Sequence, residues 1–351
     1  MKKLVYILPE ASQTSHMKYN VEFISALQNE EDVEIFLIIE RGNIYNLKEK
    51  TGVKYVRFTG TNFFTRIPKI LFFLLESFLF GFRKVYVHYS FVGAISASLF
   101  PFVKVFYWNC GMPWNYKRPI LQDFYESFTY KLVDNFVTAS ENLAKKYSEF
   151  YNFDSQKSII IPNWIDVEKV STNKLNTKEK QKILFFNQRI SERKGANYLP
   201  KILEANPNVK LLISNEGPYK EKLLQELKEK KLLKNVEMLG KISQEKVLEI
   251  FQSVDLYILP SNEEGMSHSL MEAFASGTPT VAFNVGATKE MFPENFKDFV
   301  VEAGNISEFN KKIQELLNDE EKSKKISNAL REEIKKYDKK IVLKEFVKKI
   351  F

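Results

Sequence analysis

The sequence predicts an α/β protein with two doubly wound parallel-sheet domains. Apolar runs of strand length alternate with segments whose apolar residues recur at helical spacing. Each strand is separated from the next by a helix-length segment, which is typical of right-handed parallel crossovers. The alternation occurs in two series, and the polar, glycine-free stretch STNKLNTKEKQ from Ser171 separates them.

The chain has 351 residues, enough for two domains of ordinary size. We predict an N-terminal domain over residues 1–165 and a second domain over residues 166–335. Residues 336–351 are predicted to form a C-terminal helix that can pack back on the first domain. The helical end of the chain carries an apolar stripe of Ile341, Val342, Phe346 and Ile350.

The apolar pattern places each element of the two series. The predicted strands of the first domain are Leu4–Leu8, Val33–Ile39, Lys54–Phe58, Lys84–His88, Lys104–Trp108, Asn135–Ala139 and Ser158–Ile161, with helices near His16–Asn29, Phe91–Phe100, Leu121–Leu132 and Glu141–Phe150. The predicted strands of the second domain are Lys182–Asn187, Val209–Ser214, Val236–Leu239, Val254–Leu259, Thr280–Phe283 and Phe299–Val301, with helices near Pro218–Lys231, Gln244–Phe251, His268–Ser276 and Ile306–Leu317.

Composition excludes several classes of protein. The single cysteine, Cys110, allows no intrachain disulfide, which fits a reducing compartment. The charged start MKKLVYILPEAS has an apolar run too short for a signal peptide, so Leu4–Leu8 is read as the first core strand. No zinc-finger spacing or other nucleic-acid signature is present, and the three histidines are too far apart in sequence to suggest a metal cluster.

Positive charge is concentrated in the first domain. Residues 41–120 hold 12 basic residues against Glu49 and Glu76, which indicates an anionic surface or substrate. Within this block, the stretch from Arg66 to Lys84 has a nearly continuous apolar centre, too short to cross a bilayer. Its basic ends favour a helix lying in an anionic membrane surface, whereas its length equally suits a buried helix. A helix with one face in the core and the other toward lipid combines the two readings.

Two glutamates, Glu264 and Glu272, stand eight positions apart in SNEEGMSHSLMEAFASGTP. They lie at a predicted strand–loop–helix junction, where open parallel sheets bind their ligands. Gly265 permits close backbone approach, and the first turn of the following helix offers N–H groups to a phosphate. Two carboxylates beside a phosphate site suit a nucleotide sugar. Ser269 to Glu272 also matches a capping box, in which Glu272 only satisfies backbone donors.

Other loops of the second domain add cations and glycines. Arg189 and Lys194 follow its first strand in FFNQRISERKG, and both side chains can bind phosphate, although a solvated basic loop is the simpler reading of this segment alone. Gly217 and Gly240 follow the next two strands, and Gly240 permits a flat backbone near a planar base. Gly286 and Glu290 lie after the strand Thr280–Phe283.

Together these residues resemble the retaining glycosyltransferases of family 4, which have the GT-B fold of two Rossmann-like domains facing a central cleft. The resemblance covers roughly residues 158–292 and rests on the order and spacing of its motifs. They are IIPNWID, with Trp164 where glycine is usual, then Arg189 with Lys194–Gly195, Gly217–Pro218, the PSxxEG run of Pro260–Gly265, the glutamate pair, EAFASGTPTVA, and Gly286 with Glu290.

The resemblance implies a role for each matching residue. Arg189 and Lys194 would hold the donor diphosphate and stabilise it as the leaving group, and Glu264 would contact the donor sugar near the reacting carbon. Glu272 would accept hydrogen bonds from the ribose. The amides of Gly265, Met266 and Ser267 would add to the phosphate site, with Gly217 and Gly240 at the rim. The two cations would replace a metal, since no Asp-x-Asp motif lies nearby; no cofactor is expected.

The first domain conforms less to this family. Its first loop, PEASQTSHMK, lacks the glycines that the family often has, and Cys110 stands where the family frequently has histidine. His16, His88 and Asn109 are candidate contacts for the acceptor or sugar, although a structural histidine explains the first two equally well. No activating partner marks Cys110 as a nucleophile.

The resemblance therefore implies a retaining, metal-independent transferase that moves a sugar from a nucleoside diphosphate, UDP rather than GDP, to a saccharide acceptor. The basic, aromatic first domain suits a lipid-linked acceptor at the cytoplasmic face of the membrane, in bacterial surface polysaccharide or glycolipid synthesis. No nucleic-acid partner is expected. Two alternatives remain open: a nucleotide-sugar epimerase of the same fold, and a non-catalytic module that binds nucleotide sugar or membrane.

Overall fold

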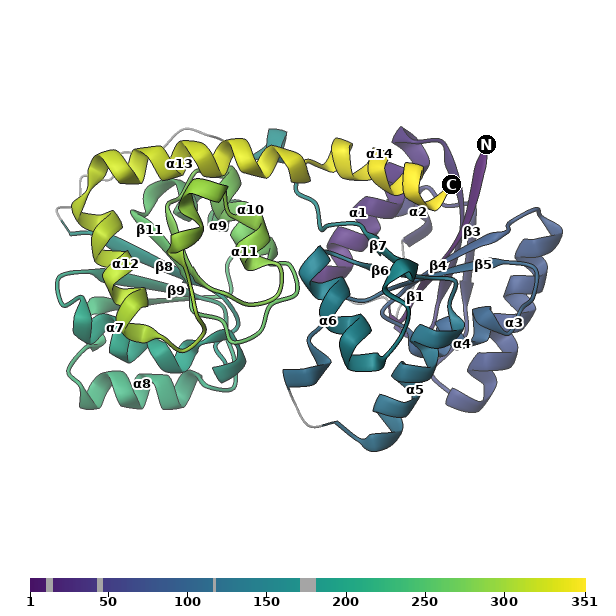
Figure 1. Ribbon diagram of the computed structural model, residues 1–351, viewed down its shortest axis with the longest axis horizontal. Helices are drawn as coiled ribbons and strands as arrows, with labels where there is room; N and C mark the ends of the chain where they lie inside the picture. Colours follow the sequence, from purple (N-terminus) through teal and green to yellow (C-terminus); the bar gives the residue numbers. More distant parts are fainter. Residues whose placement is uncertain (11–14, 43–46, 116–117, 171–180) are drawn as a thin grey trace. The chain divides into compact units, whose positions relative to one another are not determined.

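The computed structural model describes residues 1–10, 15–42, 47–115, 118–170 and 181–351, apart from the side chains of residues 15–18 and 63–64. The chain divides into two compact units. The first contains Met1–Pro162 together with Lys340–Phe351, and the second contains Asn163–Lys339 (Figure 1).

The first unit is built on a seven-stranded sheet in the order β3-β2-β1-β4-β5-β6-β7, and every pair of neighbouring strands is parallel. Its strands are β1 (Lys2–Leu8), β2 (Val33–Ile39), β3 (Tyr55–Phe58), β4 (Lys84–His88), β5 (Lys104–Trp108), β6 (Asn135–Thr138) and β7 (Ser158–Ile160). Its helices are α1 (Ser15–Glu30), α2 (Leu47–Thr51), α3 (Phe63–Leu79), α4 (Phe91–Ser98), α5 (Ile120–Leu132), α6 (Glu141–Tyr151) and α14 (Lys339–Ile350), whose first residue belongs to the second unit.

The second unit is built on a six-stranded parallel sheet in the order β10-β9-β8-β11-β12-β13. Its strands are β8 (Ile183–Asn187), β9 (Lys210–Ser214), β10 (Val236–Gly240), β11 (Leu256–Leu259), β12 (Thr280–Phe283) and β13 (Val300–Val301). Its helices are α7 (Leu199–Ala205), α8 (Lys220–Glu229), α9 (Gln244–Ser253), α10 (His268–Ala275), α11 (Thr288–Met291), α12 (Ile306–Asn318) and α13 (Glu320–Ile334).

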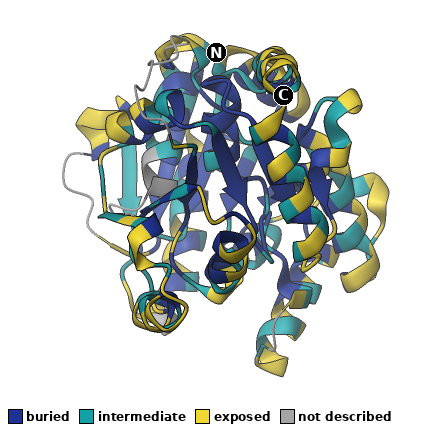
Figure 2. Cartoon of the chain, turned by 90° about the vertical axis from the view of Figure 1, so that its left-hand side faces the viewer, coloured by how far each residue is buried: buried dark blue, intermediate teal, exposed yellow. Residues whose placement is uncertain are grey.

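The predicted fold class, two doubly wound parallel sheets, is confirmed. Both sheets carry helices on their faces, so their central strands are buried and read as continuous apolar runs. All five residues of β8 and all four of β11 and β12 are buried. Figure 2 shows burial concentrated in the strands, with exposed residues on the outer sides of the helices.

The two ends of the chain meet in the first unit. On α14, Phe346 packs edge-on against Phe23 of α1 (ring centroids 5.1 Å apart) and against Tyr86 of β4 (5.0 Å). The Lys84 ammonium donates to the carbonyls of Ile350 (2.8 Å) and Phe351 (2.9 Å). The prediction that Ile341 belongs to the buried apolar stripe is wrong, because Ile341 is 47% exposed. Leu343 and Val347 are buried with the remaining members instead.

The segment from Arg66 to Lys84 has apolar residues both in the core and on the surface, and its contact with a membrane stays a prediction. On α3, Ile70 and Leu74 are completely buried, whereas Phe72 and Leu79 are 64% and 75% exposed. The apolar run continues past the end of the helix through a turn at Gly81 (φ 88°). No helix in the described part of the chain combines the length and the hydropathy that crossing a bilayer requires.

Candidate functional site

Three of the predicted site residues, Arg189, Lys194 and Glu264, lie on the loops that follow β8 and β11, at the centre of the second sheet. These strands are neighbours and parallel, so the loops that follow them leave the same edge. The loop after β8 carries Lys194 and the loop after β11 carries Glu264, and their ammonium and carboxylate groups are 2.8 Å apart. Both side chains are largely buried, with 16% and 7% exposed. This ion pair was not predicted, because the resemblance implied separate roles for the two residues.

Lys194 is held by more than one acceptor. Its ammonium also donates to the backbone carbonyl of Glu263 (3.1 Å), and the Glu263 carboxylate pairs with Arg193 (3.1 Å). An ammonium has three donors. Lys194 gives one of them to the Glu263 carbonyl and forms an ion pair with Glu264, whose Oε1 takes no hydrogen bond within the described residues. Arg189 lies on the same loop with its side chain exposed, where it can meet an anion from solvent.

Glu272 is a buried carboxylate on α10, with 6% of its surface exposed. Its Oε1 accepts a hydrogen bond from the Gln244 carboxamide at 2.5 Å, and Gln244 is the first residue of α9. Two helices that follow different strands therefore meet at this carboxylate. Gln244 was not predicted from the sequence, because it stands 28 residues from its partner and belongs to no recognisable pattern.

The start of α10 has the features of an anion-binding helix terminus. Ser267 is the N-cap, and its hydroxyl accepts from Leu270 N. Within the described residues, no protein acceptor takes the backbone N–H groups of Gly265, Met266 or Ser267. Amides of this kind, at the positive end of a helix dipole, suit a phosphate. The capping-box alternative is wrong, because it requires Ser269 rather than Ser267 at the N-cap.

Two glycines allow the loops of this edge to pack on one another. A Cβ on Gly195 (φ 79°) would lie 1.8 Å from the carbonyl oxygen of Pro260, and a Cβ on Gly286 (φ 56°) would lie 1.8 Å from that of Glu264. Ala287 N also donates to Gly265 O (2.8 Å). The loop after β8, which we call the cation loop because it carries Arg189 and Lys194, thus packs against the Glu264 loop after β11 and the loop after β12. The three loops form one close-packed rim.

The remaining predicted glycines lie on the loops of the outer strands. Gly217 follows β9, where Tyr219 N donates to Ile190 O (3.0 Å) of the cation loop. Gly240 (φ 64°) ends β10, and its carbonyl accepts from Asn215 N at 2.6 Å. Both therefore belong to the same edge of the sheet as the two glutamates.

A buried polar network behind the rim was also missed. The Gln188 carboxamide donates to the hydroxyls of Tyr257 (3.1 Å) and Ser269, and Tyr257 donates to Ser269 at 2.8 Å. Ser269 in turn lies 3.0 Å from the N-cap hydroxyl of Ser267. Burial raises the pKa of Tyr257, so this phenol stays protonated and remains a donor. The network fixes the residue before Arg189 to the first turn of α10.

The crossover segment also touches this site. The Asn163 carboxamide donates to Met266 O (2.8 Å), and its backbone N–H lies 3.3 Å from the Met266 sulfur. Asn163 opens the second unit within the motif IIPNWID. The motif was predicted as a crossover, but nothing in its composition indicated a contact with the loop between the two glutamates.

In the first unit, the structure gives His88 a packed environment. Its imidazole stacks on Trp108 with ring centroids 4.1 Å apart, and its Nε2 is 3.3 Å from the Asn20 carboxamide. Only 6% of its surface is exposed. His16 lies in the first turn of α1, and its side chain is outside the part of the chain that the structure describes.

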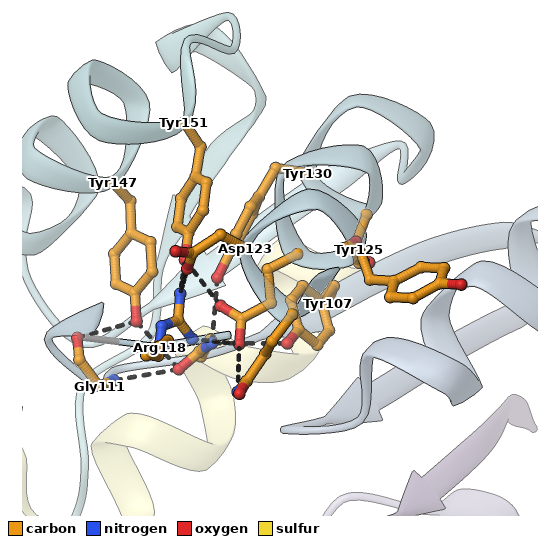
Figure 3. Close-up of polar contacts among 12 residues, drawn as sticks. Tyr107, Gly111, Arg118, Asp123, Tyr125, Tyr130, Tyr147 and Tyr151 are labelled. Atoms are coloured by element: carbon orange, nitrogen blue, oxygen red, sulfur yellow. Dashed lines mark hydrogen bonds and ion pairs between the residues drawn. The ribbon is translucent and has the colours of Figure 1, made fainter. Parts of the chain in front are cut away.

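Asn109 belongs to a network of tyrosines and charged groups (Figure 3). Its Oδ1 accepts from Gly111 N and from the Tyr147 hydroxyl, both at 3.0 Å, and its Nδ2 donates to Tyr130 at 3.0 Å. The arrangement supports a role in shaping the loop after β5. The neighbouring Cys110 is buried, with its sulfur 2.9 Å from the Tyr89 hydroxyl.

Metal independence stays a prediction. Across the residues whose positions are described, no three His, Cys, Asp or Glu side chains gather closely enough to hold a metal ion.

Comparison with known proteins agrees with this geometry. Residues 167–333, nearly the whole second unit, match the family of glycosyl transferases group 1. An uncharacterized glycosyltransferase of Methanocaldococcus jannaschii is 25% identical over 198 residues, which are 52% of this chain and 50% of that protein. The chain thus spans about half the length of this curated relative.

Solved structures extend the likeness to the first unit. The lipopolysaccharide outer core galactosyltransferase WaaB superposes with a TM-score of 0.81 at 16% identity, covering 99% of both chains. Anabaena HepE in complex with UDP superposes with a TM-score of 0.79 at 15% identity, again covering 99% of both chains. At these identities the likeness shows the fold, which is GT-B. The family match is to glycosyl transferases and lies in the second unit, whereas the solved structures share the fold of both units.

Proposed function

We propose that this protein is a retaining glycosyltransferase of family 4 that transfers a sugar from a nucleoside diphosphate to a saccharide acceptor. The observation that carries the proposal is the Lys194–Glu264 ion pair on the loops at one edge of the second sheet, where α10 begins with its N-terminal amides and carries the buried Glu272. Cations and amides there suit a diphosphate, and the carboxylates suit the hydroxyls of the sugars on either side of it.

In this proposal each group stabilises charge or position. Arg189 and Lys194 bind the diphosphate, and they stabilise the negative charge that grows on it as the glycosidic bond breaks. Glu272 holds the ribose, and Glu264 orients the donor sugar at its reacting carbon. The leaving phosphate takes the proton of the acceptor hydroxyl on the same face of the sugar, so the anomeric configuration is retained. The two cations neutralise the charge of the diphosphate, as a bound metal ion would.

The donor nucleotide and the acceptor are assigned from separate observations. HepE was solved with UDP, which favours UDP over GDP as the donor nucleotide. The exposed phenylalanine and leucine side chains of α3 and the basic charge of the first unit favour a lipid-linked acceptor at the inner face of the cell membrane. Synthesis of a bacterial surface polysaccharide or glycolipid is the setting that fits these properties.

Binding of nucleotides tests the donor half of the proposal. A ligand present at 100 times its dissociation constant stabilises a protein by about 2.7 kcal/mol, which a thermal-shift screen of UDP, GDP and their sugars detects. We expect UDP compounds to raise the melting temperature. Glu272→Ala should abolish this shift, whereas Glu229→Ala, an exposed carboxylate of α8, should leave it unchanged. Equal shifts for both variants would refute the donor site.

Turnover tests the catalytic half. We expect Lys194→Ala to lower the transfer rate by about two orders of magnitude, the loss typical of removing one preorganised electrostatic group. Lys201→Ala, on the exposed side of α7, is the matched control. Product anomers identified by NMR should keep the donor configuration. An inverted product, or isomerisation of the donor without any acceptor, would replace the proposal with a different enzyme class.

A further inference from the structure

Helix α5 turns its polar side inward. Its Glu126 is buried and pairs with the Arg118 guanidinium (2.6 Å), which also pairs with Asp123 (2.6 Å). The Tyr151 hydroxyl from α6 donates to the second oxygen of Glu126 at 2.8 Å. Figure 3 shows these groups converging on Arg118. This network fixes the rotation of α5 about its own axis.

The outward side of α5 is correspondingly apolar. Ile120 is 87% exposed, Leu121 69% and Phe124 62%, and Phe128 lies one turn further along the same side. In Figure 3, Tyr125 points away from the Arg118 network, and its ring stacks on Phe91 of α4. A soluble helix normally has the opposite orientation, with its apolar stripe inward. An inverted helix held by a buried ion-pair network indicates a surface that meets an apolar partner.

The apolar surface continues over the neighbouring helices. Helix α4 contacts both α3 and α5 (Figure 1). The segment after α4 exposes Leu99 (61%) and Phe102 (62%), and the Phe102 ring lies 5.4 Å from that of Phe78 on α3. We call the whole set the outer apolar surface. Its members are Phe72, Leu75, Leu79, Leu99, Phe102, Ile120, Leu121, Phe124, Tyr125 and Phe128.

Positive charge is in excess within residues 60–132, which contain the whole of this surface. Residues 60–132 contain three carboxylates, and an arginine pairs with each of them: Arg57 with Glu76, and Arg118 with Asp123 and Glu126. The cations Lys69, Arg83, Lys104 and Lys131, in contrast, are exposed. Two copies of this chain joined through the outer apolar surface would place these cations opposite one another. An anionic lipid bilayer instead offers hydrocarbon to the apolar side chains and phosphate to the cations.

We propose that the outer apolar surface, with α5 at one end and α3 at the other, is where this protein docks on an anionic bilayer. The proposal deepens the membrane contact put forward under the proposed function and rests on it for the nature of the acceptor. It adds α5 and the segment after α4 to the contact. Aromatic and aliphatic side chains enter the acyl boundary, while the lysines and Arg83 bind lipid phosphates.

Vesicle flotation of the full chain tests the docking surface. We expect binding to vesicles of phosphatidylglycerol and phosphatidylcholine at low salt, and much weaker binding to phosphatidylcholine alone. The double variant Leu121→Ser/Phe124→Ser should bind the anionic vesicles at least about tenfold more weakly, because two large apolar side chains leave the contact. Leu233→Ser, which changes a 40% exposed leucine of the second unit, should bind as the wild type does.

Three results would overturn the proposal. One is undiminished flotation of the double variant. Another is equal binding to neutral and anionic vesicles. The third is a wild-type dimer, seen by light scattering, that the double substitution converts to monomer, because the surface would then bind a second copy. The UDP thermal shift of the double variant should match that of the wild type, so the docking surface and the donor site succeed or fail separately.

Discussion

At the scale of single residues, each acidic group of the candidate site is fixed by a partner on another element. Glu264 is held by Lys194, and Glu272 is held by Gln244. A buried carboxylate without such partners would be costly to ionise. Gln244 neutralises no charge, but it leaves one rotamer of Glu272 favoured and so pre-orients the oxygens proposed to accept from the ribose.

The substitution Gln244→Ala should therefore weaken the binding of the donor and leave the chemical step unchanged. Hydrogen bonds to charged groups contribute about 1.5–3 kcal/mol, so we expect the KM for the donor to rise about tenfold. The kcat should change little, because Gln244 touches no reacting atom in the proposed arrangement. Gln244→Glu should be worse than alanine, since two carboxylates would then face each other. Initial rates at varied donor concentration separate the two parameters, and a fall in kcat alone would contradict the positioning role.

Residue-scale prediction from sequence succeeded in placing groups where a motif fixed their spacing. Glu264, Glu272 and Lys194 lie at one edge of one sheet, as the order of the loops indicated. Gln244 and Gln188 were not predicted as part of the site, because their partners are 28 and 69–81 residues away in the sequence. Only the packing of parallel crossovers brings such residues together. A glutamine at the start of an amphipathic helix has no local pattern that distinguishes it from a solvated one.

At the scale of elements, α10 is anchored at both ends. Its start is joined to β8 and β11 through the Gln188, Tyr257 and Ser269 network. At its C-terminal end, Arg331 of α13 donates to Ser276 O (3.1 Å) and Ser327 donates to Gly277 O (2.6 Å). These donors satisfy carbonyls that a helix terminus leaves open. The amides that face the proposed phosphate therefore move little relative to the sheet.

The packing of loops at this rim makes Gly286→Ala informative. An alanine at φ 56° is strained by about 1–2 kcal/mol, and here its Cβ would also collide with the Glu264 carbonyl. The Glu264 loop must then shift, so we expect donor affinity to fall about tenfold or more, as measured by isothermal titration with UDP. Gly304→Ala is the matched control, because φ is 85° and its nearest contact is 3.8 Å away. If both variants bind UDP equally well, the rim does not position the donor.

Element prediction depended on how regular each apolar pattern was. Val33–Ile39, Lys84–His88, Lys104–Trp108 and Thr280–Phe283 are strands over the predicted residues, because buried parallel strands are continuous apolar runs. The short helices α2, α7 and α11 were missed. They span only five, seven and four residues, too few to repeat a helical period, and α7 has a proline in its first turn. Helix α8 begins two residues later than predicted, at Lys220 rather than Pro218.

At the scale of the whole molecule, the first unit is not one continuous stretch of the chain. The first unit is completed by Lys340–Phe351, after the entire second unit has been passed. Contacts such as that between Lys84 and Ile350 join residues 266 positions apart. Non-local contacts of this kind form late, because a long loop must close before they add stability. The first unit therefore cannot reach its final packing until the last helix has been synthesised.

This arrangement predicts that the end of the chain stabilises the beginning. Phe346 is fully buried between Phe23 and Tyr86, so Phe346→Ala should lower the free energy of unfolding of the first unit by about 3–5 kcal/mol. Ile341→Ala, on the exposed side of the same helix, should cost less than about 1 kcal/mol. Urea unfolding followed by tryptophan fluorescence in a Trp164→Phe background measures both, since the remaining tryptophans, Trp108 and Trp114, lie in the first unit. UDP binding at the second unit should survive in Phe346→Ala under native conditions. A variant that unfolds like the wild type would show that α14 is dispensable to the first unit, and a loss of both folding and UDP binding would show that the two units do not fold separately.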